Sequence, residues 1–290
     1  MYWERVTEEI YLFTSERYAR VNSVAIRTKE GIVVIDALPF PSEAKQIANF
    51  LSAQGNGHFH SLMLTHHHAD HSYGLFAFPA YLELIAHASC RQKLLTEGAA
   101  SLAETKRNHP SFNQVTIRIP TITFEEESMF VRAGDRTFQL FSLPGHTEDN
   151  IGIYLKEERV LIAGDAVMAI PVIAQGNLQR EIQTLQKIKN LAPLTILQGH
   201  GEVILRGEVD TVIDHYIDYL TCVEKKARQL VVDNKPRDLI WDIPLEACGL
   251  ERVPLGLGSQ QLHTANVFSV YDQLKAVRDR EANPEDDAAI

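Results

Sequence analysis

The sequence predicts an α/β protein, built as a four-layer αββα sandwich with a C-terminal helical extension. Stretches rich in β-branched and aromatic residues precede amphipathic stretches, and this order of strands and helices occurs twice along the chain. Two sheets that each carry helices on one face are expected to pack together through their other faces. We expect residues 1–232 to form the layers and residues 233–290 to extend the same domain.

The first half predicts strands separated by two helices. Ser42 follows a proline-rich break and is the expected N-cap of the first helix, and Ser89 is expected to start the second helix, which continues to about Asn108. The expected strands of this half cover residues 9–13, 21–27, 31–36, 60–65 and 82–86.

The second half repeats the pattern and ends in helices. A turn at Gly134-Asp135 divides the strands expected within 115–143. Ile182, Leu185 and Ile188 share one face of a helix expected over 179–191. The remaining expected strands are 151–155, 159–162 and 194–197, and the remaining expected helices are 208–232 and 259–280. The acidic tail from Glu281 is expected to fray.

Composition and charge exclude several classes of protein. Hydrophobic residues make up 45% of the 290 residues, which is too many for a disordered chain. The net charge of −10 argues against nucleic acid as a partner. No apolar run approaches the ~18 residues of a membrane span, and the charged N-terminus lacks an apolar signal core, so a cytoplasmic protein without membrane partners is expected.

The three cysteines suggest neither a disulfide framework nor a metal site. Cys90, Cys222 and Cys248 are far apart in the sequence and odd in number. They are expected to be buried or idle thiols.

The histidines are the unusual feature of the composition. Four of the 12 lie close together in the pattern H-x-H-x-D-H, directly after an expected strand. His66 and His68 are two residues apart and project to the same side of an extended loop, whereas His67 points away and is not an expected ligand. Asp70 and His71 follow as the chain turns into a helix. Ligands at this spacing can serve two neighbouring metal ions better than one tetrahedral ion.

Taken together with later motifs, this pattern resembles the metallo-β-lactamase superfamily. The resemblance covers about residues 5–205, and each motif falls at the end of an expected strand. Besides the first motif and Asp36, it includes Pro144-Gly145-His146-Thr147, Ala163-Gly164-Asp165 and Gly199-His200-Gly201.

The resemblance implies a dinuclear metal centre. It assigns His66, His68 and His146 to the first ion. It assigns Asp70, His71 and His200 to the second, with Asp165 bridging both ions. Asp36 is implied to orient the histidine loop by accepting hydrogen bonds. Five imidazoles and two carboxylates suit two divalent ions, of which zinc is the expected metal and iron or manganese the alternatives.

Such a centre predicts a hydrolase. Two divalent ions lower the pKa of a bound water enough to supply hydroxide near neutral pH, and they stabilise the oxyanion that forms. Asp70 is the expected catalytic residue, which orients this hydroxide and moves its proton. The β-lactamases of this fold carry Cys or Ser where this chain has Asp165, which favours other members of the superfamily.

We therefore expect hydrolysis of a small-molecule carbonyl substrate, which could be an ester, a thioester or a lactone. Residues 166–178 are apolar, and no obvious Arg or Lys clamp accompanies the motifs. The alternatives are a β-lactamase-like amide hydrolase, a phosphodiesterase, an iron-dependent oxidoreductase similar to persulfide dioxygenases, and a non-catalytic metal-binding module. A homodimer is possible. His263 is expected to lie on the surface or in the core, with a substrate or subunit contact as the alternative.

Overall fold

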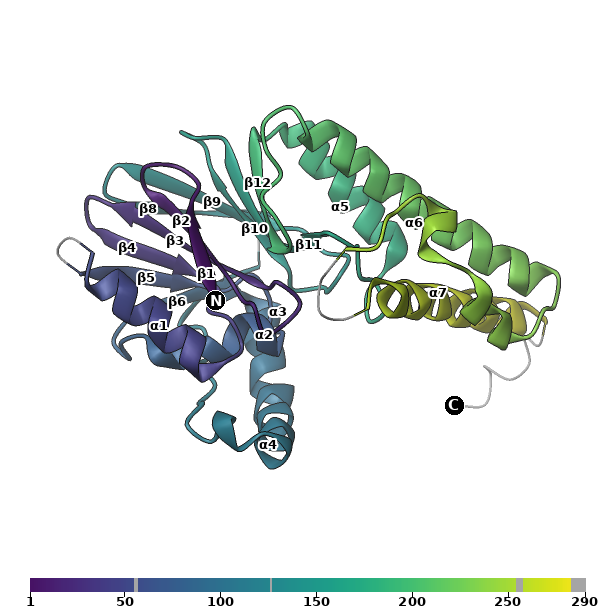
Figure 1. The fold of residues 1–290 in the computed structure, drawn as a ribbon, viewed down its shortest axis with the longest axis horizontal. Coiled ribbons are helices and arrows are strands. Elements are labelled where there is room, and N and C mark those ends of the chain that lie inside the picture. Colours follow the sequence, from purple (N-terminus) through teal and green to yellow (C-terminus); the bar gives the residue numbers. More distant parts are fainter. Residues whose placement is uncertain (55–56, 126, 254–257, 283–290) are drawn as a thin grey trace.

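The computed structural model describes residues 1–290 except 55–56, 126, 254–257 and 283–290. Two β-sheets lie face to face between two groups of helices, which confirms the expected αββα sandwich (Figure 1). In spatial order, the first sheet contains β1 (Tyr2–Arg5), β2 (Ile10–Thr14), β3 (Asn22–Thr28), β4 (Gly31–Ile35), β5 (Phe59–Met63), β6 (Leu84–His87) and β7 (Ile122–Phe124). The second sheet contains β12 (Thr195–His200), β11 (Val160–Met168), β10 (Ile151–Leu155), β9 (Arg136–Ser142) and β8 (Ser128–Ala133).

The first sheet changes from antiparallel to parallel pairing at β4. Strands β1 to β4 pair antiparallel with one another, and β4 to β7 pair parallel. Parallel neighbours need crossover connections. The helical segments between these strands are α1 (Pro41–Ser52), α2 (Ala69–Ser72), the 3₁₀ turn η1 (Tyr73–Ala77), α3 (Ala88–Lys93), the π-helical turn η2 (Leu94–Gly98), α4 (Ala99–Asn108) and the 3₁₀ turn η3 (Pro110–Phe112).

The second sheet is antiparallel except at one edge. Strands β8 to β11 pair antiparallel, whereas β11 and β12 run parallel and are joined through α5 (Leu178–Leu191). Asn177 caps α5, since its side chain accepts a hydrogen bond from the backbone N–H of Arg180. The predicted histidines lie on the segment after β5, on the loop after β9 and at the last residue of β12.

Alternation along the strands explains the layers. In β2, Ile10 and Leu12 contribute to the cluster between the two sheets, whereas Tyr11 and Phe13 pack toward the helices of the first sheet. In β11, Val160 and Ile162 face the other sheet, and Leu161 and Ala163 face the second group of helices. Because side chains point to alternate faces of a strand, continuous apolar runs fit strands that are buried on both faces.

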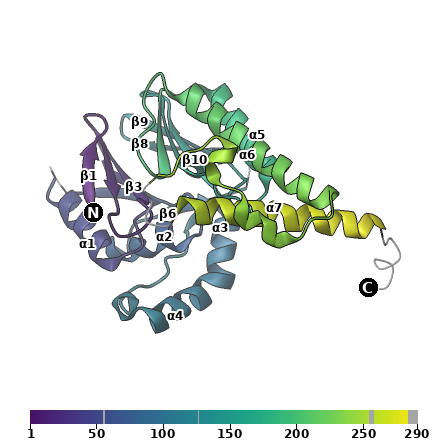
Figure 2. The ribbon, with the colours of Figure 1, turned by 45° about the vertical axis from the view of Figure 1, so that its right-hand side comes forward.

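The C-terminal extension packs on the helices of the second sheet. Helix α6 (Val209–Val232) is followed by the 3₁₀ turns η4 (Arg237–Asp242) and η5 (Leu245–Cys248) and by α7 (Ser259–Ala282). Helices α6 and α7 lie side by side in both views (Figures 1 and 2). Val267, Val270 and Tyr271 of α7 share one apolar cluster with α5, α6 and the second sheet.

Several expected boundaries were wrong. The first helix begins at Pro41 with Phe40 as its N-cap residue, because proline fits the first position of a helix and Ser42 already lies inside it. The helix expected over 89–108 is divided by η2 into α3 and α4. The last strand continues to His200, and β1 was not predicted. The expected frayed tail begins inside α7 and otherwise lies outside the described residues.

The expectation of three free thiols was also wrong. Cys222 of α6 and Cys248 of η5 form a disulfide, with their Cα atoms 5.4 Å apart, and only Cys90 is free and buried. Sequence spacing could not show this pairing, because the chain folds back between the two residues. No described helix has the length and apolar composition required to cross a membrane.

Candidate metal centre

The structure brings all seven predicted ligands together, from strands and from the segments that follow them. His66 and His68 lie on the loop that follows β5, and α2 then carries Asp70 and His71. His146 lies between β9 and β10, Asp165 lies within β11, and His200 is the last residue of β12. The register of β11 against β12 shifts around Gly164, whose φ is +54°. Glycine adopts this backbone conformation readily, and the next residue is Asp165.

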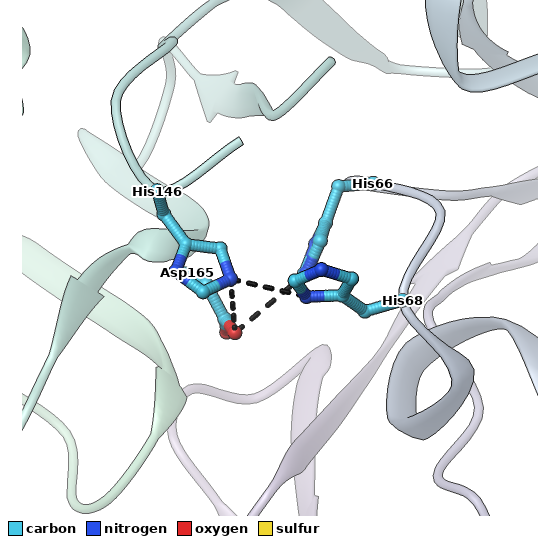
Figure 3. A group of neighbouring side chains, drawn as sticks. All are labelled: His66, His68, His146 and Asp165. Carbon is cyan, nitrogen blue, oxygen red and sulfur yellow. Dashed lines mark hydrogen bonds and ion pairs between the residues drawn. The ribbon is translucent and has the colours of Figure 1, made fainter. Parts of the chain in front are cut away.

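One group contains His66, His68, His146 and Asp165, whose candidate ligand atoms all lie within 4.8 Å of one another (Figure 3). The Oδ2 atom of Asp165 lies 3.4 Å from Nε2 of His146 and 3.6 Å from Nε2 of His66. The Nδ1 atom of His68 lies 3.1 Å from Nε2 of His146. Ring and carboxylate atoms thus converge from three separate segments of the chain.

A second group contains Asp70, His71 and His200, with ligand atoms again within 4.8 Å. Nε2 of His200 lies 3.2 Å from Oδ2 of Asp70 and 3.5 Å from Oδ2 of Asp165. The Oδ1 atom of Asp165 lies 3.2 Å from Nε2 of His71. Asp165 therefore contacts members of both groups, in the position that a bridging carboxylate would need.

The second ring nitrogen of four histidines has a defined partner. The Nδ1 atom of His71 lies 2.8 Å from Oδ2 of Asp36, and that of His66 lies 3.1 Å from the hydroxyl of Thr65. His200 and His146 instead use backbone carbonyls: Nδ1 of His200 lies 2.9 Å from Ala19 O, and Nδ1 of His146 lies 2.6 Å from Val172 O. Such partners fix the ring orientation and the tautomer of a metal ligand.

Asp36 connects the first sheet to the histidine loop. Its Oδ1 accepts the backbone N–H of Thr65 at 2.8 Å, and its Oδ2 accepts the Thr65 hydroxyl at 2.7 Å, besides lying close to His71. Asp36 and Ala19 both have positive φ, 56° and 44°. Non-glycine residues in this region carry strain, which the surrounding hydrogen bonds must offset.

Some potential metal-ligand atoms of the cluster make no hydrogen bond, and they are of the types that bind divalent cations. Nε2 of His66, Nε2 of His71 and Oδ1 of Asp165 are buried and make no well-aligned hydrogen bond to the described residues, although the last two atoms are 3.2 Å apart. Buried polar atoms are rarely left unpaired, and here three of those that the described residues contain lie at one centre. Imidazole nitrogens and carboxylate oxygens at such a centre are ligands suited to zinc and to related transition metals.

The pKa values of four histidines are shifted, in opposite directions in the two groups. Burial, with help from neighbouring histidines, lowers the pKa of His66 well below its ordinary value and that of His68 to about 3, so both rings are neutral. Burial alone would also lower the pKa of His71 and His200. Asp165 and Asp70 override it, raising the pKa of His71 well above its ordinary value and that of His200 to about 10. The carboxylates therefore create a field that favours positive charge at the second group.

His67 contributes no atom to either group, in line with its predicted role. Its backbone N–H donates to Oδ2 of Asp149 at 2.8 Å, and its Nδ1 lies 2.9 Å from Oδ1 of the same carboxylate. Asn150 also supports the centre, because its Oδ1 accepts the backbone N–H of Asp165 at 3.2 Å. Asp149 and Asn150 were not predicted, because their place two and three residues after the His146 motif gave no indication of their long-range partners.

A mostly apolar cavity of about 360 Å³ adjoins the second group. Asp70 lies in its wall, together with Tyr18, Phe40, Ala69, Tyr73 and Phe112. The apolar residues 166–178 do not line it. Ile170 and Ile173 are instead fully buried in the helix-side core of the second sheet.

His263 belongs to the interior of the C-terminal extension. It is fully buried in α7, with Nδ1 3.2 Å from the hydroxyl of Tyr219 on α6. The core alternative is therefore the one realised.

Comparison with known proteins identifies the family. The model of the metallo-beta-lactamase superfamily matches residues 19–200. An atrochrysone carboxyl ACP thioesterase of Aspergillus fumigatus is 27% identical over 196 residues, covering 67% of this chain and 55% of the thioesterase. A hydroxyacylglutathione hydrolase of Cereibacter sphaeroides is 29% identical over 162 residues, covering 54% of each chain. The chain thus spans about half the length of these curated relatives.

A solved structure extends the fold match to nearly the whole chain. The metallo-beta-lactamase family protein of Thermus thermophilus superposes with a TM-score of 0.67 over 96% of both chains, at 15% identity. At that identity the match concerns the fold, whereas the matched family model also spans all seven converging residues. The chain belongs to the metallo-beta-lactamase superfamily.

Proposed function

We propose that this protein is a metal-dependent hydrolase that holds two divalent ions, with zinc as the favoured metal, and cleaves a small-molecule carbonyl substrate. One observation supports the proposal: Asp165 belongs to one group of ligand atoms and contacts His71 and His200 of the other, and buried ligand atoms of His66, His71 and Asp165 make no hydrogen bond to the described residues. In this assignment His66, His68 and His146 hold one ion, Asp70, His71 and His200 hold the other, and Asp165 bridges them.

Asp70 is the proposed catalytic residue. When bound, the two ions would supply Lewis acidity and a water that is acidic enough to react near neutral pH. Burial tends to raise the pKa of Asp70, but His71 and His200 lower it to about 2, so the carboxylate is ionised. Because Asp70 also lies in the cavity wall, its carboxylate would be placed to orient an attacking water and to accept a proton from it.

The cavity supports an uncharged substrate with an apolar group. Phe40, Tyr73 and Phe112 form an aromatic wall, with ring centroids 5.6 Å apart for Phe40 and Phe112 and 6.1 Å apart for Tyr73 and Phe112. Among the described residues that line the cavity there is no lysine or arginine that would bind a phosphate. We infer an ester, thioester or lactone whose apolar part occupies this cavity, and a relative named as a thioesterase supports the choice.

The first test is elemental analysis of the protein after purification and after reconstitution with Zn²⁺. We expect two equivalents of a divalent metal in the wild-type chain and fewer in Asp165→Ala. His58→Ala is the matched control, because His58 is an exposed histidine outside both groups. A single iron per chain would favour the oxidoreductase alternative. Protein that binds no metal would contradict the proposal.

The second test is a substrate panel containing aryl and alkyl esters, thioesters, lactones, a phosphodiester and a β-lactam. We expect turnover of carbonyl substrates with an apolar acyl group, and a loss of at least ~10²-fold in kcat for Asp70→Asn. Turnover of the phosphodiester or the β-lactam alone would contradict the substrate class. No turnover by metal-replete protein, with Zn²⁺ or Mn²⁺, would favour the binding module.

A further inference from the structure

The loop after β11 reaches the centre through its backbone rather than through a side chain. Val172 O accepts the Nδ1 hydrogen of His146 at 2.6 Å. This hydrogen bond leaves Nε2 as the free lone pair of the ring, and Nε2 is the atom that lies 3.4 Å from Asp165. The position of one carbonyl group therefore sets the orientation of His146. No substitution at position 172 removes that carbonyl, so the residues that fix the loop control it.

A single asparagine of the C-terminal extension holds this loop on both sides of Val172. Asn266 lies in α7, its Oδ1 accepts the backbone N–H of Ile173 at 2.9 Å, and its Nδ2 donates to Pro171 O at 2.7 Å. The side chain thus binds the two residues that flank Val172. Because the two contacts use the oxygen and the nitrogen of one planar amide, they fix both the position and the orientation of the peptide groups next to Val172.

Asn266 is itself held in place by hydrogen bonds within the C-terminal helices. Its Nδ2 also donates to the hydroxyl of Tyr219 at 3.0 Å, and that hydroxyl lies 3.2 Å from Nδ1 of His263. Asn266, Tyr219 and His263 are all fully buried. A buried amide is costly unless its hydrogen bonds are made, and Asn266 makes three. The network therefore specifies one side-chain orientation instead of filling space as an apolar residue would.

A second contact joins the same loop to the His146 segment. The backbone N–H of Asn177 donates to Gly145 O at 2.8 Å, and a Cβ atom at Gly176 would collide with the carbonyls of Gly145 and His146. The loop therefore lies directly against the His146 segment. Asn266 at one end and this close approach at the other leave little freedom for Val172 between them.

We propose that Asn266 is a positioning residue for His146 and that α7 thereby completes the metal centre. The inference rests on the proposed function, because it assigns His146 to a bound ion. It also explains why the C-terminal extension buries a polar network, which core packing alone does not require. Hydrogen-bond partners of ligating histidines typically change metal affinity 10- to 100-fold, and Asn266 acts through one such partner, Val172 O.

The test is Zn²⁺ binding by Asn266→Ala in competition with a chromophoric chelator, resolved into two equivalents. We expect one equivalent to bind about 10- to 100-fold more weakly than in the wild type, and the other to change less. Gln260→Ala is the matched control. Gln260 also lies in α7 and makes two hydrogen bonds to backbone, but to Leu245 N and Ile243 O, each at 2.9 Å. It should retain both affinities even if it lowers stability.

A milder variant covers the case in which Asn266→Ala does not fold. Tyr219→Phe removes only the hydroxyl behind Asn266, and we expect it to weaken the same zinc equivalent by a smaller factor and to shift the ¹⁵N resonance of His146 Nδ1. Wild-type affinities in Asn266→Ala, or in Tyr219→Phe if the former does not fold, would overturn the inference. Equal weakening by Gln260→Ala would do the same. A wild-type chain that binds no Zn²⁺ would overturn the proposed function as well, so the two failures are distinguishable.

Discussion

Glu181 offers a sharp test of the electrostatics behind the His146 segment. It lies in the first turn of α5, is 1% exposed, and its Oε2 has no hydrogen-bond partner among the described residues. Burial raises the pKa of this carboxyl well above 4.5, and the negative charge of Asp165 adds to the effect. The carboxyl is therefore protonated in the folded chain at pH values where the unfolded chain has released the proton.

The substitution Glu181→Gln replaces the neutral acid by a neutral group of the same shape. Between pH 4.5 and the folded-state pKa, the folded wild type binds one proton more than the unfolded chain, so its free energy of unfolding falls as the pH rises. The glutamine variant lacks this dependence. Its stability relative to the wild type should rise by about 1.4 kcal/mol per pH unit across that window. Below pH 4.5 the difference should be constant.

Urea denaturation of both proteins at several pH values from about 4 to about 8 measures the effect. Both proteins are measured without metal, because the charge of Asp165 contributes to the shift. The remaining titrating groups are the same in the two chains. Glu104→Gln, at an exposed position of α4, is the control and should follow the wild type. A difference between Glu181→Gln and the wild type that does not change with pH would refute the reasoning, as would one that shrinks as the pH rises.

Three further predictions follow from single contacts. His67→Ala should retain two zinc equivalents by elemental analysis, because His67 belongs to neither group of ligand atoms, and loss of one would contradict that placement. Asp36→Asn should weaken zinc binding about 10- to 100-fold in a chelator competition, because His71 loses its charged partner, and unchanged affinity would show that this contact is dispensable. Cys222→Ser should lower the free energy of unfolding by about 3 kcal/mol, since the disulfide to Cys248 closes a loop with a sequence separation of 26. The loss should appear only without reductant, and an equal loss with reductant would mean that the thiols are not paired.

The parts of the centre that local sequence determines were predictable. His66, His68 and His71 lie within one short segment after an apolar strand, so neither their proximity nor their common edge depends on tertiary packing. His146 and His200 required the resemblance to a family, because an isolated histidine at a strand end is usually an ordinary surface or core residue. The structure then places their rings within reach of Asp165.

The supporting contacts were not predictable, for a physical reason. Two of the five imidazoles are held by backbone carbonyls, those of Ala19 and Val172, and every residue carries a carbonyl. Nothing in the identity of Val172 distinguishes it from its apolar neighbours. The sequence around Asn266 likewise gave no indication of its contacts, because the residues that it holds are more than 90 positions away along the chain. Only the packing of α7 against the loop after β11 gives these residues a role.

Because its supporting contacts depend on tertiary packing, the centre is sensitive to the relative position of the two sheets. Asn22 of β3 donates through Nδ2 to Gln198 O and Gly201 O, each at 2.9 Å, and so attaches the first sheet to the chain around His200. Ala19, which holds the ring of His200, lies just before β3, whereas Asp165 belongs to the second sheet. The His200 ring contacts both Ala19 O and the Asp165 carboxylate. A relative shift of the sheets would therefore move these two groups apart from one another. Metal affinity should thus decline in variants that loosen the contact between the sheets, even where every ligand is retained.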